Sequence, residues 1–375
     1  MFQKFARSVL PLLLGGSMLA GCASTAETTA LRAAPTSTAA SGDCQAIGNA
    51  RPICGFQNPE DLVALPDDDA ILVSEFGSIS GGKAGVLSLF VPETEERRVI
   101  FRGGDAAGAN PVWGDAACPG PPGAGFSPHG VHLSRRSDGA LQLLVVQHGG
   151  RESVEFFEVT GEGRNSVVQW RGCALAPGRT WLNSVAATPD GGFVATNMMD
   201  RPNPGEDVNA AFAEARPPSG YVVTWNPARG FGKLPGSEGA MLNGIEVSPD
   251  GQHLFVNYST DGQVRKVDRA TGAVQAVAKI PHLDNARWAP DGSLVVASLV
   301  GGNDELFAHC MNLQSGACPV AFNLHAVDPE TMEHELLYGN KGTPMGAGTV
   351  GLVVGDEVYV GTFAGDRILR VRLDR

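Results

Sequence analysis

Hydrophobic and polar residues alternate in short runs along this chain, and many of the runs come in pairs joined by a tight turn. In residues 241–256, one alternating run leads into Pro249-Asp250-Gly251 and a second alternating run follows. A period of two is typical of a half-buried β-strand, and Pro, Asp and Gly suit a chain reversal. The stretch therefore predicts a β-hairpin.

The same turn signature recurs along the chain at intervals of about 40 to about 70 residues, which suits a four-stranded unit with variable loops. The six marks are Leu65-Pro66-Asp67, Ser137-Asp138-Gly139, Pro189-Asp190-Gly191, Pro249-Asp250-Gly251, Pro290-Asp291-Gly292 and a looser Val354-Gly355-Asp356. Apolar strand patterns dominate between them, and long helical patterns are absent. Six irregular all-β repeats predict a six-bladed β-propeller, with a β-sandwich or two tandem β-domains as the rival architectures.

Oxygen-bearing side chains occupy one register in the four repeats that keep the proline. Glu60, Asn183, Asn243 and Asp284 each stand six positions before it, and Asn285 follows directly. The innermost strands of a propeller line its central channel, so equivalent residues at their starts are expected to converge at the channel mouth. The alternative is that these are ordinary turn residues, which are common where strands begin.

Carboxylates and carboxamides without sulfur or histidine form a set of hard oxygen ligands. Such ligands favour Ca²⁺, which accepts many oxygens in loose geometry, over Zn²⁺. Glu60 and Asp284 would supply negative charge, and the three asparagines neutral oxygens. The cofactor expected here is therefore Ca²⁺.

One of the two repeats that lack the proline carries histidine instead. His129 stands where its strand begins, and His148 ends the partner strand, so the hairpin would bring both rings to one rim. The pKa of histidine lies near ambient pH, which suits general-base catalysis. A structural hydrogen-bonding role is the alternative.

The N-terminal segment has a different character from the repeats. Residues 1–21 combine a positive start with an apolar run too short to span a bilayer, and Leu19-Ala20-Gly21-Cys22 closes the segment. This resembles a bacterial lipoprotein signal, in which Cys22 would be acylated and anchor the chain to a membrane surface. An ordinary secretory signal is the alternative. Residues 22–42 read as a disordered tether, and residues 43–375 as one large domain.

Charge and cysteine content add two restrictions. The formal net charge of −12, without a basic stripe, argues against a nucleic-acid partner and is compatible with a cation site. With Cys22 lipidated, six cysteines remain for disulfides in an oxidising compartment, and no C-x-x-C spacing supports zinc. Cys310 and Cys318 flank a short loop, and the further candidate pairs, by neighbourhood alone, are Cys44 with Cys54 and Cys118 with Cys173.

Several of these segments resemble the paraoxonase and arylesterase lactonases. The resemblance rests on residues 127–131, 144–148 and 153–157, and also on residues 243–251 and 283–285, which are shared in part with the wider gluconolactonase group. It covers the predicted propeller as a whole. It implies Ca²⁺ in the channel, with ligands Glu60, Asn183, Asn243, Asp284 and Asn285, a base or water-orienting histidine at His129, and a partner at His148.

The resemblance also implies possible ligands of a second calcium ion, Asp61 and the carbonyl of Val131. The acid expected as the third ligand is Ser184 here. Where the family often shows an Asp-His pair, this chain has Met198-Met199, which makes a more apolar wall. Residues 200–220 form the longest irregular insert, with a helical piece at 206–216, and are expected to act as a lid or as surface decoration.

The sequence thus predicts a Ca²⁺-dependent hydrolase of lactones or aryl esters, with a small-molecule substrate, anchored by lipid in a bacterial cell envelope on the outer-membrane or periplasmic side. The ion would polarise the carbonyl, and His129 would activate water. The alternatives are a non-catalytic envelope propeller with structural calcium, and another hydrolase of this fold that acts on sugar lactones or phosphotriesters.

Overall fold

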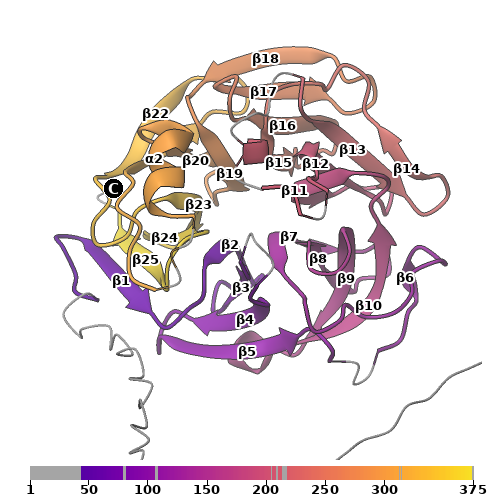
Figure 1. Ribbon diagram of the computed structural model, residues 1–375, viewed down its shortest axis with the longest axis horizontal. Coiled ribbons are helices and arrows are strands. Elements are labelled where there is room, and N and C mark those ends of the chain that lie inside the picture. The colour runs from indigo at the N-terminus through magenta and orange to yellow at the C-terminus, as the bar shows by residue number, and fades with distance from the viewer. Residues whose placement is uncertain are drawn as a thin grey trace, which may run out of the picture. The chain divides into compact units, whose positions relative to one another are not determined.

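The computed structural model describes residues 44–373, apart from 79–81, 106–108, 204, 208–209, 213–217, 312 and 314. In this part of the chain, six sheets stand radially around a common centre, as the ribbon in Figure 1 shows. The first strand of each sheet contacts the first strands of its two neighbours, which closes the ring. The predicted all-β, six-bladed propeller is therefore confirmed.

Blades 1 to 3 follow one another along the chain. Blade 1 consists of β2 (Pro59–Ala64), β3 (Ile71–Glu75), β4 (Val86–Val91) and β5 (Glu96–Arg102). Blade 2 consists of β7 (Pro128–Arg135), β8 (Leu141–Gln147), β9 (Ser153–Thr160) and β10 (Val167–Leu175), with the short β6 (Trp113–Gly114) at its edge and the 3-10 helix η1 (Gly163–Asn165) before β10. Blade 3 consists of β11 (Thr180–Ala187), β12 (Phe193–Asp200), β13 (Tyr221–Asn226) and β14 (Gly230–Lys233).

Blades 4 to 6 complete the ring. Blade 4 consists of β15 (Leu242–Val247), β16 (His253–Tyr258), β17 (Gln263–Asp268) and β18 (Val274–Lys279). Blade 5 consists of β19 (Leu283–Trp288), β20 (Leu294–Leu299), β21 (Phe322–Val327) and β22 (His334–Asn340), with helix α2 (Gly302–His309) between β20 and β21. Blade 6 consists of β23 (Gly348–Val354), β24 (Glu357–Thr362), β25 (Arg367–Arg372) and β1 (Ala50–Cys54).

The two ends of the described chain share the last blade. Strand β1 pairs antiparallel with β25, with Ala50 opposite Val371, and in Figure 1 the indigo β1 runs beside the yellow β25. The Asn49 side chain also donates to the Arg372 carbonyl at 2.9 Å. The ring is therefore closed by backbone hydrogen bonds between its first and last strands.

The middle strands are buried on both faces because each sheet packs between two others. In β8, Leu143 and Val145 pack with Leu87 of blade 1, while Leu144 and Val146 face the core shared with blade 3. All four are fully buried, so the strand reads as a continuous apolar run and lacks the simple alternation of a one-sided sheet. The hydrophobic core therefore lies between the blades, around the channel.

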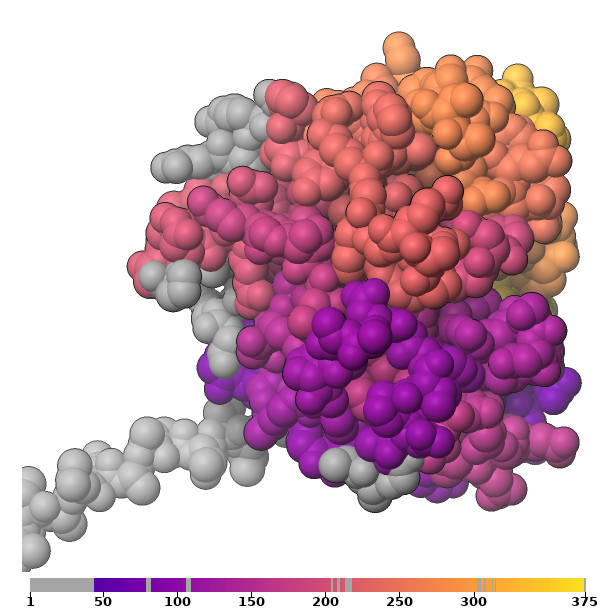
Figure 2. Space-filling view, turned by 90° about the vertical axis from the view of Figure 1, so that its right-hand side faces the viewer, coloured from indigo at the N-terminus to yellow at the C-terminus, as the bar shows by residue number. Residues whose placement is uncertain are grey.

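The outer face is held together by further contacts between segments. In the side view of Figure 2, the violet segment around β6 lies against the salmon outer strands of blade 3, where the Trp225 indole donates to Asp115 at 2.9 Å. Disulfides join Cys44 to Cys54, Cys118 to Cys173, and Cys310 to Cys318. The predicted signal peptide, the tether and Cys22 lie outside the described residues. Within those that are described, no helix has the length and apolarity needed to cross a bilayer.

Candidate metal centre and adjoining histidine pair

The innermost strand of each blade contributes a polar side chain to a single pocket at the hub of the ring. These residues are Glu60 from β2, His129 from β7, Asn183 from β11, Asn243 from β15, Asp284 from β19 and Thr349 from β23. The predicted Asn285 lies next to Asp284, and its amide nitrogen donates to Glu60 Oε1 at 2.7 Å. The structure thus brings together all five oxygen-bearing residues that the turn register singled out.

An irregularity in strand pairing accompanies each of these positions. The register between the first and second strands shifts between Pro59 and Asp61 in blade 1, and the equivalent shift encloses the pocket residue in every other blade. A β-bulge bends its strand and re-aims a side chain. The bulges therefore turn one residue per blade toward the pocket.

The backbone of several pocket residues is fixed by the blade before it. Thr349 donates to the Glu60 carbonyl at 2.6 Å, and Asn257 donates to the Asp284 carbonyl at 2.6 Å. Blades 2 and 3 also approach each other closely at Gly130. A Cβ at this position would lie 2.4 Å from the Asn183 carbonyl oxygen, so the contact requires glycine. Neighbouring blades thus set the positions of these pocket residues.

Four of the five predicted ligands hold a buried oxygen that has no hydrogen-bond partner among the described residues. These atoms are Glu60 Oε2 and the Oδ1 atoms of Asn183, Asn243 and Asn285. A buried polar atom without a partner costs about 1–3 kcal/mol, and a bound ion is one established explanation for such groups. The unpartnered oxygens are hard ligands of the kind that Ca²⁺ prefers. The residues present therefore fit a calcium ion.

The charges in the pocket also favour a cation. Burial and the neighbouring Glu60 carboxylate raise the pKa of Asp284 well above its ordinary value, because two buried negative charges repel each other. Among the described residues, no group of three or more His, Cys, Asp and Glu side chains is placed to hold a metal ion. A metal site here would thus depend on the carboxamide oxygens as well as on Glu60 and Asp284.

The two predicted histidines lie in direct contact beside this centre. His129 Nδ1 is 2.8 Å from His148 Nε2, and His129 Nε2 is 3.4 Å from Glu60 Oε1. Burial acts to lower the pKa of His129, but the carboxylates of Glu60, Asp284 and Asp61 together raise it. Burial lowers the pKa of His148, and Glu152 offsets this only in part. Of the two rings, that of His129 lines the pocket and that of His148 lies behind it.

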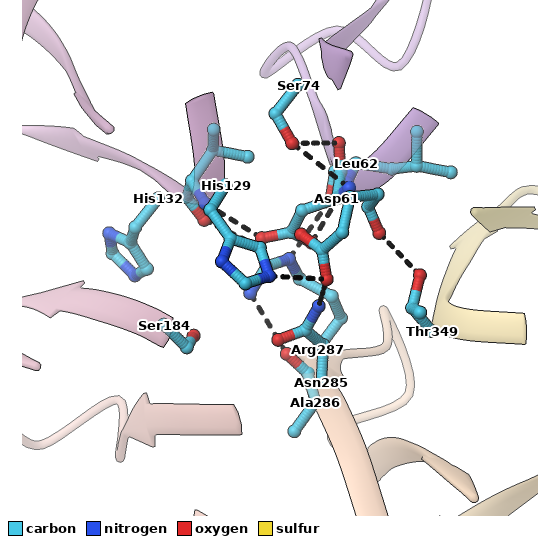
Figure 3. A network of polar contacts seen from close by, with 12 residues as sticks. Asp61, Leu62, Ser74, His129, His132, Ser184, Asn285, Ala286, Arg287 and Thr349 are labelled. Carbon is cyan, nitrogen blue, oxygen red and sulfur yellow. Dashed lines mark hydrogen bonds and ion pairs between the residues drawn. The ribbon is translucent and has the colours of Figure 1, made fainter. Parts of the chain in front are cut away.

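A side chain of the protein occupies the position where the sequence suggested a second metal ion. The Arg287 guanidinium donates through Nη2 to both Asp61 Oδ2 and the Val131 carbonyl, and Figure 3 shows it beside Asp61. Its remaining donors reach Glu246 Oε1 at 2.9 Å and the Leu62 carbonyl at 3.0 Å. The oxygens of Asp61 and Val131 thus already hold a buried cation, which argues against a second ion there.

The Arg287 cluster predicts a pH dependence of stability. Burial, only partly offset by Arg287, raises the pKa of Glu246 to about 7, whereas an unfolded glutamate titrates near about 4.3. The folded protein therefore holds a proton that the unfolded chain releases, and the free energy of unfolding should fall as pH rises from about 5 to about 7. Urea unfolding at pH 5, 6 and 7 should show this decline. Glu246→Gln should make it shallower, and Asp61, whose pKa burial raises to about 6, should account for the rest. An equally steep decline in the variant would contradict the assignment.

The wall of the pocket is mostly apolar. Its apolar members are Phe76, Met198, Phe212, Met241, Leu283, Leu299, Leu306, Met311 and Phe363. Phe212 belongs to the insert predicted as a lid or decoration, and its ring packs on Trp181 at 5.0 Å between centroids. Part of that insert thus lies at the pocket, while residues 204, 208–209 and 213–217 lie outside the described chain.

Sequence reasoning missed several residues of this region. Thr349 has the same spacing from Gly355 of the looser turn as the other pocket residues have from their prolines, so the register could have found it. Leu306 and Met311 come from α2 and the segment after it, where no long helical pattern was recognised. Glu152 and Arg287 carried no turn-register signal, because each is placed only by tertiary contacts.

Comparison with known proteins gives the same fold. A family model described as SMP-30/Gluconolactonase/LRE-like region matches residues 144–298, which lie within blades 2 to 5. A gluconolactonase from Xanthomonas campestris is 14% identical, with a TM-score of 0.50 over 86% of this chain and 89% of that one. A luciferin-regenerating enzyme is 12% identical, with a TM-score of 0.50 over 85% of this chain and 92% of that one.

Both likenesses cover most of the ring. The matched residues include Asn183, Asn243 and Asp284, which stand at one register in blades 3 to 5. Residues 144–298 thus match an SMP-30/Gluconolactonase/LRE-like family model, and the six-bladed fold of the described chain is similar to that of the gluconolactonase.

Proposed function

We propose that this protein is a calcium-dependent hydrolase of lactones and related esters. The observation that carries the proposal is one pocket, next to a histidine, where Glu60, Asn183 and Asn243 hold unpartnered buried oxygens beside the carboxylate of Asp284. Asn285, which donates to Glu60, adds a fourth such oxygen. The gluconolactonase-type region supports a lactone as the substrate class. A purely structural calcium site would not need a histidine pair at its edge.

The residues that would hold the ion are Glu60, Asn183, Asn243, Asp284 and Asn285. A calcium ion bound there supplies Lewis-acid polarisation of a substrate carbonyl and stabilises the negative charge that develops on its oxygen. His129 is the group placed to take a proton from water, since its Nε2 faces Glu60 in the pocket and its Nδ1 contacts His148. In this proposal the chain supplies the general base and the ligands of the ion.

The apolar wall of the pocket favours lactones with hydrocarbon substituents over sugar lactones. The hydroxyl groups of a sugar need polar partners, and the hydroxyl-bearing residues that line the pocket are Ser259 and Thr349. Thr349 already donates to the Glu60 carbonyl. Met198 and Met241, by contrast, offer adaptable apolar contacts to an alkyl or aryl chain.

A panel of aliphatic, aromatic and sugar lactones, assayed with and without chelator, tests both parts of the proposal. We expect EDTA to abolish hydrolysis and added Ca²⁺ to restore it. We expect kcat/KM for alkyl lactones to exceed that for a sugar lactone by at least about tenfold, since two additional buried methylenes contribute about 1.6 kcal/mol. Full activity in chelator would refute the role of calcium. Calcium binding without turnover of any lactone or ester would favour the non-catalytic propeller.

The three disulfides support an exported location. Bonds between Cys44 and Cys54, Cys118 and Cys173, and Cys310 and Cys318 suit an oxidising compartment, where disulfides persist. Acylation of Cys22 in a bacterial cell envelope stays a prediction. Mass spectrometry of the mature N-terminus, with a Cys22→Ala control, would test it.

A further inference from the structure

His148 is held from both sides of its ring. Its Nε2 lies 2.8 Å from His129 Nδ1, and its Nδ1 lies 3.0 Å from each carboxylate oxygen of Glu152. Glu152 comes four residues after His148, in the loop between β8 and β9. The three side chains form a line that runs from the pocket into the seam between blades 2 and 3.

Glu152 is itself fixed by residues of blade 3. The Leu182 backbone N–H donates to Oε1 at 2.7 Å, and Arg201 Nη1 donates to Oε2 at 3.2 Å. Arg201 Nη2 also donates to the His148 carbonyl at 2.8 Å. The Glu152 side chain is 8% exposed, so its charge is neutralised by Arg201 and its own hydrogen bonds, with little help from solvent.

These contacts determine where the protons of the two rings lie. An ionised carboxylate only accepts hydrogen bonds, so His148 must carry its proton on Nδ1. The neutral His148 ring then accepts at Nε2, which requires His129 to donate from Nδ1. In the neutral form of His129, Nε2 is then the unprotonated nitrogen, and it lies on the pocket side, 3.4 Å from Glu60 Oε1.

We propose that Glu152 is a positioning residue that sets the tautomers of both histidines, so that His129 presents a basic Nε2 to the pocket. This inference rests on the proposed hydrolase function. In the proton step, an O–H bond of water breaks and an N–H bond forms at His129 Nε2, while the freed electron pair forms a C–O bond to the carbonyl carbon and the carbonyl π pair moves to its oxygen. The resulting imidazolium donates through Nδ1 to His148, whose own proton points at the Glu152 carboxylate. When the π pair returns, the ring C–O bond of the lactone breaks, and the proton on His129 Nε2 passes to the alkoxide that leaves.

Glu152→Gln is the informative substitution because it keeps the shape and removes the charge. The amide oxygen should keep the bond from the Leu182 N–H, which places the amide N–H₂ near Arg201 Nη1 and His148 Nδ1. His148 Nδ1 lies 3.0 Å from both positions, so a neutral amide can hold either tautomer, one through its oxygen and the other through its N–H₂. The variant thus removes the charge that selects the Nδ1 proton, which lowers the fraction of His129 with a basic Nε2 and leaves the imidazolium without its counter-charge.

We expect kcat for the best lactone to fall about 10²–10⁴-fold in Glu152→Gln, with KM within about twofold, since replacing a tautomer-fixing carboxylate by its amide costs about 10⁴ in serine proteases. Calcium affinity should be unchanged, because Glu152 contacts none of the predicted ligands. The matched control is Glu158→Gln, an ion-paired glutamate on β9 of the same blade, which should keep wild-type kcat. Equal losses in both variants would overturn the proposal.

A second measurement keeps the inference testable if Glu152→Gln does not fold. Imidazole ¹⁵N spectra of the calcium-loaded wild-type protein, assigned with His129→Gln and His148→Gln, should show both rings protonated at Nδ1. Protonation of neutral His148 at Nε2 would overturn the proposal whatever the variant does. A wild-type protein with these tautomers but no hydrolytic activity would refute the proposed function alone, so the two failures are distinguishable.

Discussion

Replacing Asp284 by asparagine is expected to lower kcat/KM for lactones by about 10²–10³-fold or more, and to weaken calcium binding. The substitution keeps the shape of the side chain but removes one of the two carboxylates among the predicted ligands. It also removes the repulsion between Asp284 and Glu60, which is the main electrostatic reason for a cation in the pocket. Loss of a single group that stabilises an oxyanion typically costs about 10²–10³ in kcat, and a weaker metal site adds to that.

The measurement is a lactone assay at increasing Ca²⁺, combined with calorimetric titration of the metal-free protein. The matched control is Asp138→Asn, a 61% exposed turn aspartate in blade 2, which should leave both quantities unchanged. Wild-type calcium affinity in Asp284→Asn would exclude this carboxylate as a ligand. If that variant kept its calcium affinity but lost lactone hydrolysis, Asp284 would act in catalysis without binding the ion.

Arg287→Met is expected to reduce the free energy of unfolding by about 3–5 kcal/mol, which is the usual cost of removing one partner from a buried ion pair. Arg287 is 4% exposed and faces two carboxylates, those of Asp61 and Glu246. Methionine fills much of the same volume but leaves both acids without a counter-charge. Because the contacts of Arg287 join blades 1, 2, 4 and 5, the substitution should weaken the packing of these four blades around the channel.

Urea unfolding monitored by circular dichroism would measure this effect. Arg51→Met is the control, since Arg51 pairs with Glu95 at the surface, is 57% exposed and should change stability by less than about 1 kcal/mol. A change in Arg287→Met no larger than that of the control would show that the buried cluster contributes little. Calorimetric titration of the wild-type protein should find one bound calcium ion per chain, since Arg287 already donates to Asp61 and to the Val131 carbonyl.

The turn pattern predicted much of the hub. A Pro-Asp-Gly turn marks the end of the innermost strand of a blade. Residues at the same sequence distance before this turn therefore lie at equivalent positions along the channel. This is why Glu60, Asn183, Asn243 and Asp284 could be selected before their positions were known, and why they line one pocket. The repeated architecture made local spacing informative about long-range contacts.

Other features depend on contacts that sequence spacing does not encode. The bulges that aim the pocket residues arise from pairing between strands, and a bulge leaves no fixed signature in either strand. Glu152 and Arg287 are polar residues whose partners lie on other blades, so nothing adjacent to them in sequence shows their role. Leu306 of α2 lines the pocket only because the connection between β20 and β21 folds back to the pocket.

The pairing of β1 with β25 has a consequence for how the protein is made. Hydrogen bonds between Asn49 and Arg372 join residues 323 positions apart, which is nearly the whole described chain. A polypeptide that emerges from a ribosome or a translocation pore with its N-terminus first must keep β1 unpaired until its final strand arrives. Folding of this blade is therefore a late event that depends on complete synthesis, and slow maturation with exposure to proteases is the expected cost.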